Sequence, residues 1–366
     1  MPQSHAAQRH GNQTAEEIEQ QVLELRQAHM RWGPRKLKRI LERDEPGRNW
    51  PATSTIGALL KREGLVVARK KRWHTAPYTE PLAHAQECNR VWCADFKGWF
   101  RTTDRERIDP LTISDAYSRY LLRCQVVEKT NTERVQAIFE AAFREYGMPE
   151  AIRTDNGPPF ASHAVAGLSR LAVWWIKLGI VPERIAAGHP EQNGRHERMH
   201  RTLKEEAAQP PAANRRQQQG ALDGFRQEYN EVRPHEALGM QTPAAVYQPS
   251  ARPVPARVPE PEYPESMLVR SVRPHGHFRW KKCDVFLSEV LWGERVGLLP
   301  EDDRWFTIYF AQLPLARFDS HKLQVTSLPE TGSGDNVTAR EEASAPSLAP
   351  HLRMEQHQKV SGMRPV

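Results

Sequence analysis

The chain has 366 residues and a mass of 42.0 kDa, which is enough for about two or three domains with their own hydrophobic cores. It carries 52 Lys and Arg against 45 Asp and Glu, a net charge of +7, which indicates nucleic acid or another polyanion as a partner. Its four cysteines include no Cys-x-x-Cys pair, which argues against a disulfide scaffold and a zinc site.

The sequence has no apolar run of the roughly eighteen residues that a membrane-spanning helix needs. Its start, Met-Pro-Gln-Ser-His, also lacks the apolar core of a signal peptide. We therefore expect no membrane association and a cytoplasmic location.

Three short helices are predicted near the N-terminus. Residues 14–17 form a capping box for the first, and Pro34 is suited to begin a second over residues 35–43. Residues 53–55 are expected to cap a third helix, which ends at Arg62 before a small strand or wing.

These helices have a basic surface, and Arg69-Lys-Lys-Arg72 follows them. The pattern predicts a helix-turn-helix DNA-binding domain over residues 12–75, with the third helix in the major groove. The alternative is a generic three-helix bundle whose basic surface serves only solubility. The expected DNA contacts are Arg35, Lys36, Ser54, Thr55, Lys61, Arg69, Lys70, Lys71 and Arg72.

After a linker over residues 76–89, the pattern changes to strands. Apolar runs at 91–100, 111–114 and 120–127 predict an antiparallel meander. A helix over residues 133–146 and a short strand over 151–154 follow. This succession predicts an α/β domain over residues 90–248, with functional residues at strand ends.

The second half of this domain contains helices and one further strand. The Trp174-Trp175 pair is expected to be core rather than a base-stacking platform, and residues 180–185 read as a strand. Residues 209–219 are predicted to be a loop, and a helix over 221–232 follows.

The C-terminal part begins with a Pro-rich stretch, predicted to be a stiff linker over residues 249–266. Five or six short strands separated by turns then predict a small all-β barrel over residues 267–325. Residues 326–366 are expected to form a disordered tail.

Three carboxylates stand out in the α/β domain. Asp95 lies in the first apolar run, and Asp155 directly follows the strand at 151–154. Glu197 lies on a charged helix, where helical spacing places it on one face with Asn193, Arg201 and Lys204. Glu205 and Glu206 are predicted to point away from that face. Taken alone, such a helix is commonly just a solvated surface.

Carboxylates on three separate elements are what a two-metal phosphoryl-transfer site requires. Hard oxygen ligands favour two Mg²⁺ or Mn²⁺ ions, with Asp95, Asp155 and Glu197 as both metal ligands and catalytic residues. Asn193, Arg201 and Lys204 are then expected to hold DNA at the metals, and Asp115 is a candidate supporting carboxylate.

These motifs resemble those of the retroviral-integrase-like transposases of bacterial insertion sequences. Their Asp-Asp-Glu triad corresponds to Asp95, Asp155 and Glu197. Further matches are Asn156-Gly157, His189-Pro190, Tyr229-Asn230, residues 233–238 and Thr242-Pro243. The resemblance is strong over residues 89–247. The sequence lacks the His/Cys zinc module of retroviral integrases. It also shows one N-terminal helix-turn-helix, whereas many relatives have two.

The resemblance implies a multidomain protein: an all-α helix-turn-helix, an α/β ribonuclease-H-like catalytic core and an SH3-like barrel. It implies a Mg²⁺-dependent DDE transposase that binds the terminal inverted repeats of its element. The enzyme would cleave the element end and join the 3′-OH to target DNA, as a homo-oligomer on double-stranded DNA at the bacterial nucleoid. A degraded, non-catalytic copy acting as a repressor and a ribonuclease-H-type nuclease are the alternatives.

Overall fold

The computed structural model describes residues 14–66, 84–128, 130–162, 164–185 and 194–328. The predictions for Arg69, Lys70, Lys71, Arg72 and Asn193, and for most of the C-terminal tail, fall outside these ranges. Among the residues that the structure describes, no helix has the length and apolar surface that crossing a membrane requires.

Three helices form at the predicted N-terminal positions, each with one apolar stripe turned inward. They are α1 (Glu16–Ala28), α2 (Pro34–Asp44) and α3 (Thr53–Arg62). Their shared core includes Val22, Trp32, Leu37, Ile40, Ile56 and Leu60. The capping box predicted at residues 14–17 is wrong, because Ala15 precedes the first helix and makes no side-chain cap. The strand predicted from Leu65 is also absent from the described residues 65–66.

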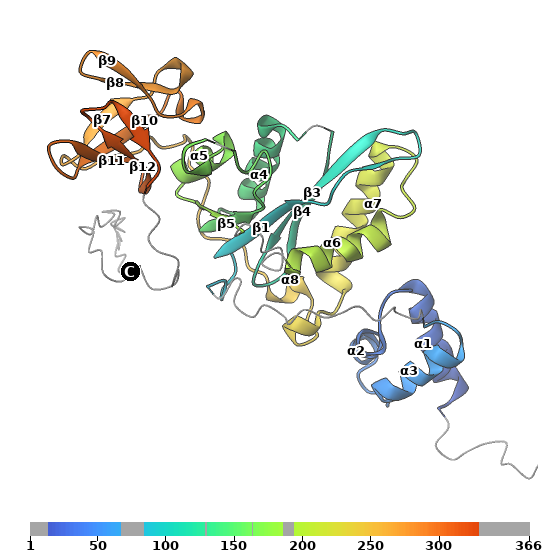
Figure 1. The fold of residues 1–366 in the computed structure, drawn as a ribbon. Coiled ribbons are helices and arrows are strands. Elements are labelled where there is room, and N and C mark those ends of the chain that lie inside the picture. Colours follow the sequence, from blue (N-terminus) through green and yellow to red (C-terminus); the bar gives the residue numbers. More distant parts are fainter. Residues whose placement is uncertain (1–13, 67–83, 129, 163, 186–193, 329–366) are drawn as a thin grey trace, which may run out of the picture. The chain divides into compact units, whose positions relative to one another are not determined.

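The α/β domain is built on one mixed sheet (Figure 1). Its strands are β1 (Val91–Phe96), β2 (Phe100–Arg101), β3 (Arg107–Asp115), β4 (Leu121–Val127), β5 (Ala151–Thr154) and β6 (Val181–Arg184). The order is β2-β3-β1-β5-β6, with β4 also pairing β3. The predicted antiparallel meander is confirmed for β1, β3 and β4, whereas β1, β5 and β6 run parallel.

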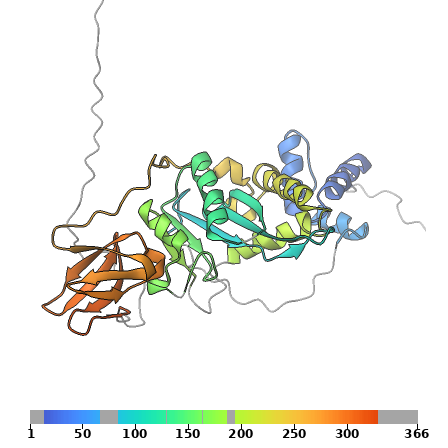
Figure 2. The same cartoon turned by 90° about the horizontal axis from the view of Figure 1, so that it is seen from above.

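Helices cover both faces of this sheet, as Figures 1 and 2 show. They are α4 (Thr132–Tyr146), α5 (Arg170–Lys177), α6 (Gly194–Ala207) and α7 (Arg215–Gln227). Trp92 and Ala94 of β1 pack in the cluster formed by α4 and α5, which also buries Trp175 as predicted. Their neighbours Val91 and Cys93 lie on the opposite face. This alternation places the next residue of that series, Asp95, on the face away from α4.

The helices α6 and α7 pack together against β4, through Met199, Leu203, Leu222 and Phe225. Helix α7 begins at Arg215, so the loop predicted over residues 209–219 is wrong in its second half. The reason is a side-chain cap, since Asn214 accepts a hydrogen bond from the Gln217 amide.

The chain leaves α7 through a π-helical turn (Glu228–Val232) and reaches the short helix α8 (Pro243–Val246). Tyr247 then stacks on Tyr120, with ring centroids 4.4 Å apart. Arg252 donates hydrogen bonds to the carbonyls of Leu178 and Gly179. The first residues of the Pro-rich stretch are thus packed on the α/β domain.

The C-terminal part is an all-β unit. Its strands are β7 (Leu268–Ser271), β8 (His277–Trp280), β9 (Cys283–Phe286), β10 (Arg295–Pro300), β11 (Trp305–Phe310), β12 (Leu313–Asp319) and β13 (Gln324–Thr326). Five form an antiparallel sheet in the order β13-β12-β11-β10-β7, and β8 and β9 form a hairpin. Phe278, Trp280, Phe306 and Phe318 form an aromatic cluster at its centre.

The β8–β9 hairpin provides a matched test of this packing. Phe278 is fully buried and meets Phe318 edge-on at 5.3 Å, whereas Phe286 is 55% exposed. We expect Phe278→Ala to lower the stability of the unit by about 3–5 kcal/mol, because it leaves a cavity. Phe286→Ala should change it by no more than about 0.5 kcal/mol. Hydrogen exchange of the β10 to β12 amides measures both, and equal effects would contradict the packing.

Candidate functional site

Asp95 and Asp155 occupy equivalent positions on neighbouring strands. β1 and β5 pair in parallel, from Val91 with Ala151 to Cys93 with Arg153. Asp95 comes two residues after Cys93, and Asp155 comes two residues after Arg153, just beyond the end of β5. Because side chains alternate along a strand, both aspartates belong to the same face as Cys93. The two aspartates thus follow equivalent positions on neighbouring strands, while the group of possible ligand atoms at Asp95 among the described residues is completed by His196 and His200.

The surroundings of the aspartates are partly shielded from water. The side chain of Asp95 is 17% exposed. Burial raises the pKa of Asp155, and a hydrogen bond from the Gly157 amide opposes that rise. Hard carboxylate oxygens in a half-buried position suit a divalent ion, which would offset the cost of burying their charge.

A lysine that the sequence reasoning missed lies beside Asp95. Burial lowers the pKa of Lys97, and the nearby Lys204 ammonium lowers it further, while Asp109 and Asp95 oppose the shift. Two lysines, one from the turn after β1 and one from α6, are thus held near a carboxylate. An anion placed there would stabilise both charges.

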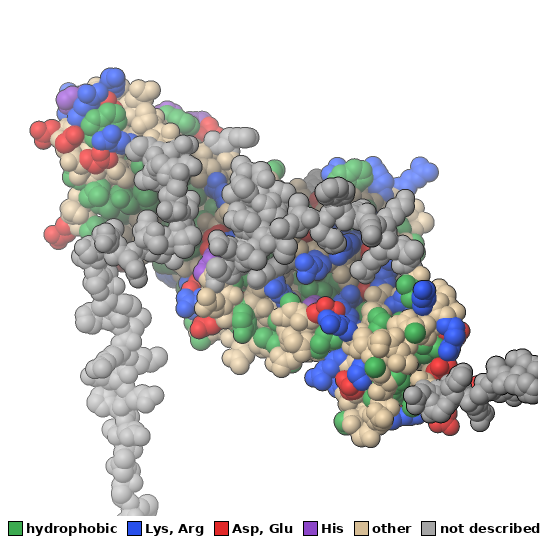
Figure 3. Space-filling view, turned by 60° about the horizontal axis from the view of Figure 1, so that its bottom comes forward, with side chains coloured by type: hydrophobic (Ala, Val, Ile, Leu, Met, Phe, Trp, Pro, Cys, Tyr) green, Lys and Arg blue, Asp and Glu red, His purple; other side chains and the backbone are tan. Residues whose placement is uncertain are grey.

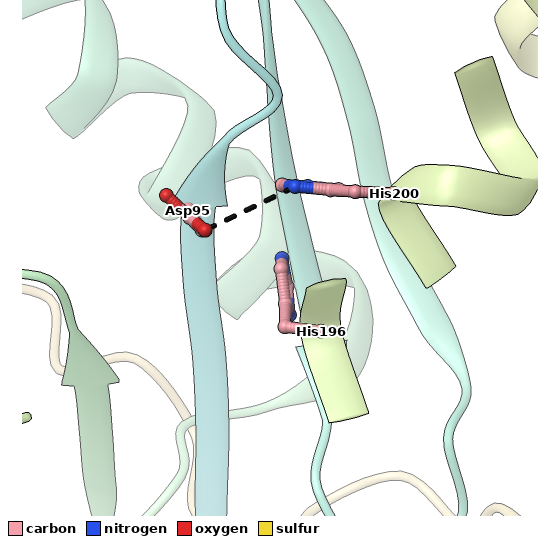
Figure 4. Close-up of side chains that lie close together, drawn as sticks. All are labelled: Asp95, His196 and His200. Atoms are coloured by element: carbon pink, nitrogen blue, oxygen red, sulfur yellow. Dashed lines mark ion pairs between the residues drawn. The ribbon is translucent and has the colours of Figure 1, made fainter. Parts of the chain in front are cut away.

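The helix α6 is fastened to the sheet by a buried polar cluster of Thr112, His196 and His200 (Figure 4 shows the two histidines with Asp95). Thr112 is the cross-strand partner of Asp95, and its hydroxyl donates to the Asp95 carbonyl at 3.0 Å. The Nε2 atoms of His196 and His200 both lie 2.6 Å from the same hydroxyl. Helix α6 is therefore attached to the sheet next to Asp95, the first of the three predicted carboxylates.

The two histidines also approach the carboxylate of Asp95. His200 Nδ1 lies 3.9 Å from Asp95 Oδ2, and one ligand atom from each of the three residues fits within 4.8 Å. Burial lowers the pKa of His196 to about 3 and that of His200 to about 2. Both imidazoles are therefore neutral near pH 7, which is the form that binds metals.

The remaining predicted residues on α6 lie on its outer side. Glu197, Arg201 and Lys204 are exposed, whereas Met199 and Leu203 are buried, in agreement with the helical spacing. Glu197 lies three residues before His200, so the two share one side of the helix. Glu197 therefore lies at the edge of the side of α6 that packs on the sheet.

Two other carboxylates differ from their predicted roles. Asp115 accepts hydrogen bonds from the amides of Asn89 and Ser118, so it stabilises a turn at the far end of β3 rather than supporting Asp95. Glu206 is not a solvated charge, because Arg233 Nη1 donates to both of its carboxylate oxygens at 2.8 Å. Removing Glu206 would leave the buried Arg233 without this partner.

The predicted DNA contacts of the three-helix unit that the structure describes lie at its surface. Ser54, Thr55 and Lys61 are exposed on α3, Arg35 is exposed on α2, and Lys36 is half-buried. In Figure 3, Lys and Arg side chains (blue) are spread over the visible surface with Asp and Glu (red) between them. Among the coloured, described residues of that view, Lys and Arg are thus interspersed with acidic side chains.

The spacing of the two histidines in the sequence also indicates a buried role. His196 and His200 are four residues apart, and Leu203 continues their series, so all three fall on one side of a helix. A polar pair on an apolar side predicts a buried hydrogen-bonded cluster. Its partner Thr112 belongs to a distant strand and could only be found in the structure.

Two family models described as "Integrase core domain" match the chain, over residues 85–190 and 178–243. An uncharacterized 31.7 kDa protein of insertion element IS407 from Burkholderia multivorans is 30% identical over 228 residues, 61% of this chain and 78% of that protein. Transposase InsD of insertion element IS2 from Escherichia coli is 26% identical over 230 residues, 58% of this chain and 72% of that transposase. The HTLV-2 integrase catalytic core domain, solved in complex with magnesium, has 16% identity and a TM-score of 0.36, covering 44% of this chain and 98% of that one.

The Thr112 cluster can be tested by removing one hydroxyl. Thr112→Val keeps the shape of the side chain but leaves two buried imidazole N–H groups without an acceptor, so we expect a loss of about 2–4 kcal/mol. Thr202→Val on α6 is the control, since the Thr202 hydroxyl donates to the Arg198 carbonyl of its own helix. Urea unfolding with hydrogen exchange of α6 measures the difference. A neutral Thr112→Val would show that the cluster does not hold the helix.

Proposed function

The chain belongs to the insertion-sequence transposases of the retroviral integrase-like superfamily, and on that premise we propose how it acts on DNA. It hydrolyses the phosphodiester bond at the end of its element and then joins the freed 3′-OH to target DNA. The fold in which it does so is ribonuclease-H-like, with a mixed sheet covered by helices on both faces.

The observation that carries this proposal is the convergence of three elements at one end of the sheet. Asp95 lies on β1, Asp155 directly follows the neighbouring strand β5, and α6 is attached beside Asp95 through Thr112. Glu197 is on the same side of α6 as His200, which approaches Asp95. In this proposal, metal binding brings the third carboxylate to the two aspartates.

In this proposal Asp95, Asp155 and Glu197 hold two Mg²⁺ or Mn²⁺ ions. Three carboxylates from separate elements form a hard oxygen donor set that fits such ions. Two bound ions would activate the attacking oxygen and stabilise the leaving one.

The cationic side chains near the site bind and orient the DNA backbone. Lys97 and Lys204 repel one another unless an anion lies between them, and a DNA phosphate is the anion that the proposed substrate offers. Arg201, exposed on α6, and Asn193, which lies outside the described residues, complete the proposed contacts. The phosphate is thereby positioned for in-line attack.

The flanking units are proposed to bind DNA and other subunits. The three-helix unit is a helix-turn-helix that recognises terminal inverted repeats, with α3 in the major groove. The C-terminal unit is an SH3-like barrel that contributes DNA or subunit contacts. Joining two element ends to one target requires at least two copies of the site, so the active species is a homo-oligomer on double-stranded DNA.

The catalytic assignment is tested by Glu197→Gln, which keeps the shape of the side chain and removes its charge. We expect cleavage and joining to fall by at least about a thousandfold, because electrostatic stabilisation supplies most of the rate in phosphoryl transfer. Binding to the inverted repeats should be unchanged. The assay is incubation of the full chain with element ends and Mg²⁺, followed by strand-resolved product analysis.

Glu133→Gln is the matched control, because Glu133 is also an exposed glutamate in the first turn of a helix. It should retain full activity. If Glu197→Gln remains active, or if Glu133→Gln is equally defective, the catalytic role of Glu197 is wrong. A wild-type chain that binds the repeats without cleaving them would favour the repressor.

The DNA-binding unit is tested by separating specific from general contacts. Lys70→Ala with Lys71→Ala should weaken binding to all duplexes alike and reduce the salt slope by about 2, since each lost phosphate contact releases about one counterion fewer. Ser54→Ala with Thr55→Ala on α3 should change sequence preference instead. Fluorescence anisotropy over a range of salt concentrations distinguishes them, and a reversed pattern would contradict the assigned roles.

A further inference from the structure

The hydrogen bonds of Thr112 determine which nitrogen of each histidine carries a proton. A threonine hydroxyl has one hydrogen to donate and can accept two hydrogen bonds. The Thr112 hydroxyl donates to the Asp95 carbonyl, which can only accept. The Nε2 atoms of His196 and His200, each 2.6 Å from that hydroxyl, must therefore both donate to it.

The two histidines differ in what surrounds their other ring nitrogen, Nδ1. Nδ1 of His196 lies 3.3 Å from the Ser114 hydroxyl, which can donate to it. Nδ1 of His200 is instead directed at Asp95, with Oδ2 at 3.9 Å. A neutral imidazole carries one N–H, and here it lies on Nε2, so an unprotonated Nδ1 faces a carboxylate oxygen. A cation placed between these two atoms would be bound by both of them.

A divalent ion fits this gap. Bonds of about 2.1 Å from one ion to a carboxylate oxygen and to an imidazole nitrogen place the two ligand atoms about 3–4 Å apart. The observed 3.9 Å lies in that range. A water molecule donating to both atoms would also fit, and the experiment below separates the two.

We propose that His200 Nδ1 is a nitrogen ligand of the ion that Asp95 binds. This inference rests on the proposed function, since it adds His200 to the metal centre of Asp95, Asp155 and Glu197. Thr112 sets the imidazole orientation by accepting from Nε2, as the outer hydrogen bond of a metal-bound histidine commonly does. One nitrogen in the donor set favours Mn²⁺ or Co²⁺ over Mg²⁺ at this position.

The probe is Mn²⁺ alone, bound to the full-length protein and observed by pulsed electron paramagnetic resonance. We expect a ¹⁴N coupling to the bound ion in the wild type. His200→Gln should abolish it, because glutamine keeps a donor at the place of Nε2 but has no atom at that of Nδ1. The affinity for Mn²⁺ should fall by about tenfold or more. His196→Gln, which removes the other donor to Thr112, should keep the coupling.

Labelling all histidines with ¹⁵N provides a readout without any substitution, because the ¹⁴N pattern must then change in the wild-type chain. A bound ion that shows no nitrogen coupling would overturn the proposal in favour of a bridging water. A coupling that persists in His200→Gln would overturn it by assigning the nitrogen ligand to another residue. Asp95→Asn separates this failure from that of the proposed function. If Asp95→Asn binds Mn²⁺ as tightly as the wild type, the carboxylate metal centre itself is wrong, and the His200 ligand with it.

Discussion

The arrangement of the candidate site depends on a single buried hydroxyl. Thr112 has no exposed surface, and its oxygen joins the backbone of Asp95 to two histidines of α6. All of its hydrogen-bonding capacity is used, which is the condition under which a buried polar group stabilises a fold rather than weakening it. Because the bonds end at the backbone of Asp95, the position of α6 and that of the first carboxylate are set by the same contact.

The alternation of β1 makes this contact possible. Trp92 and Ala94 fill the apolar core under α4 and α5, so the intervening residues face the other way. Asp95 and its partner Thr112 therefore share the face that α6 covers. One face of β1 is apolar and the other carries Asp95. The core therefore fixes the position of the strand without surrounding the charged side chain with apolar groups.

Charge is distributed in the site in a way that suits a polyanionic substrate. Asp95 lies near the end of β1 and Asp155 just beyond the end of β5, while Lys97 and Lys204 lie close to one another on the adjoining turn and helix. The two lysine charges repel one another in the absence of an anion, so a phosphate bound between them would relieve that repulsion. Neutral histidines between these groups add hydrogen bonds and ligand atoms without adding charge.

The sequence by itself determined the features that depend on local periodicity. Helix and strand positions, the inward stripes of α2 and α3, and the placement of Asp95 and Asp155 at strand ends all follow from repeats of 3.6 or two residues. It also indicated the family, because Asp95, Asp155 and Glu197 occur within recognisable motifs. Only the tertiary structure decided which distant residues meet. Three contacts span segments far apart in the chain: Glu206 with Arg233, Asp115 with the Asn89 amide, and Thr112 with His196 and His200. No local pattern predicts such pairs, because they are selected by the packing of α6 on the sheet and by the need to satisfy every polar atom that this packing buries.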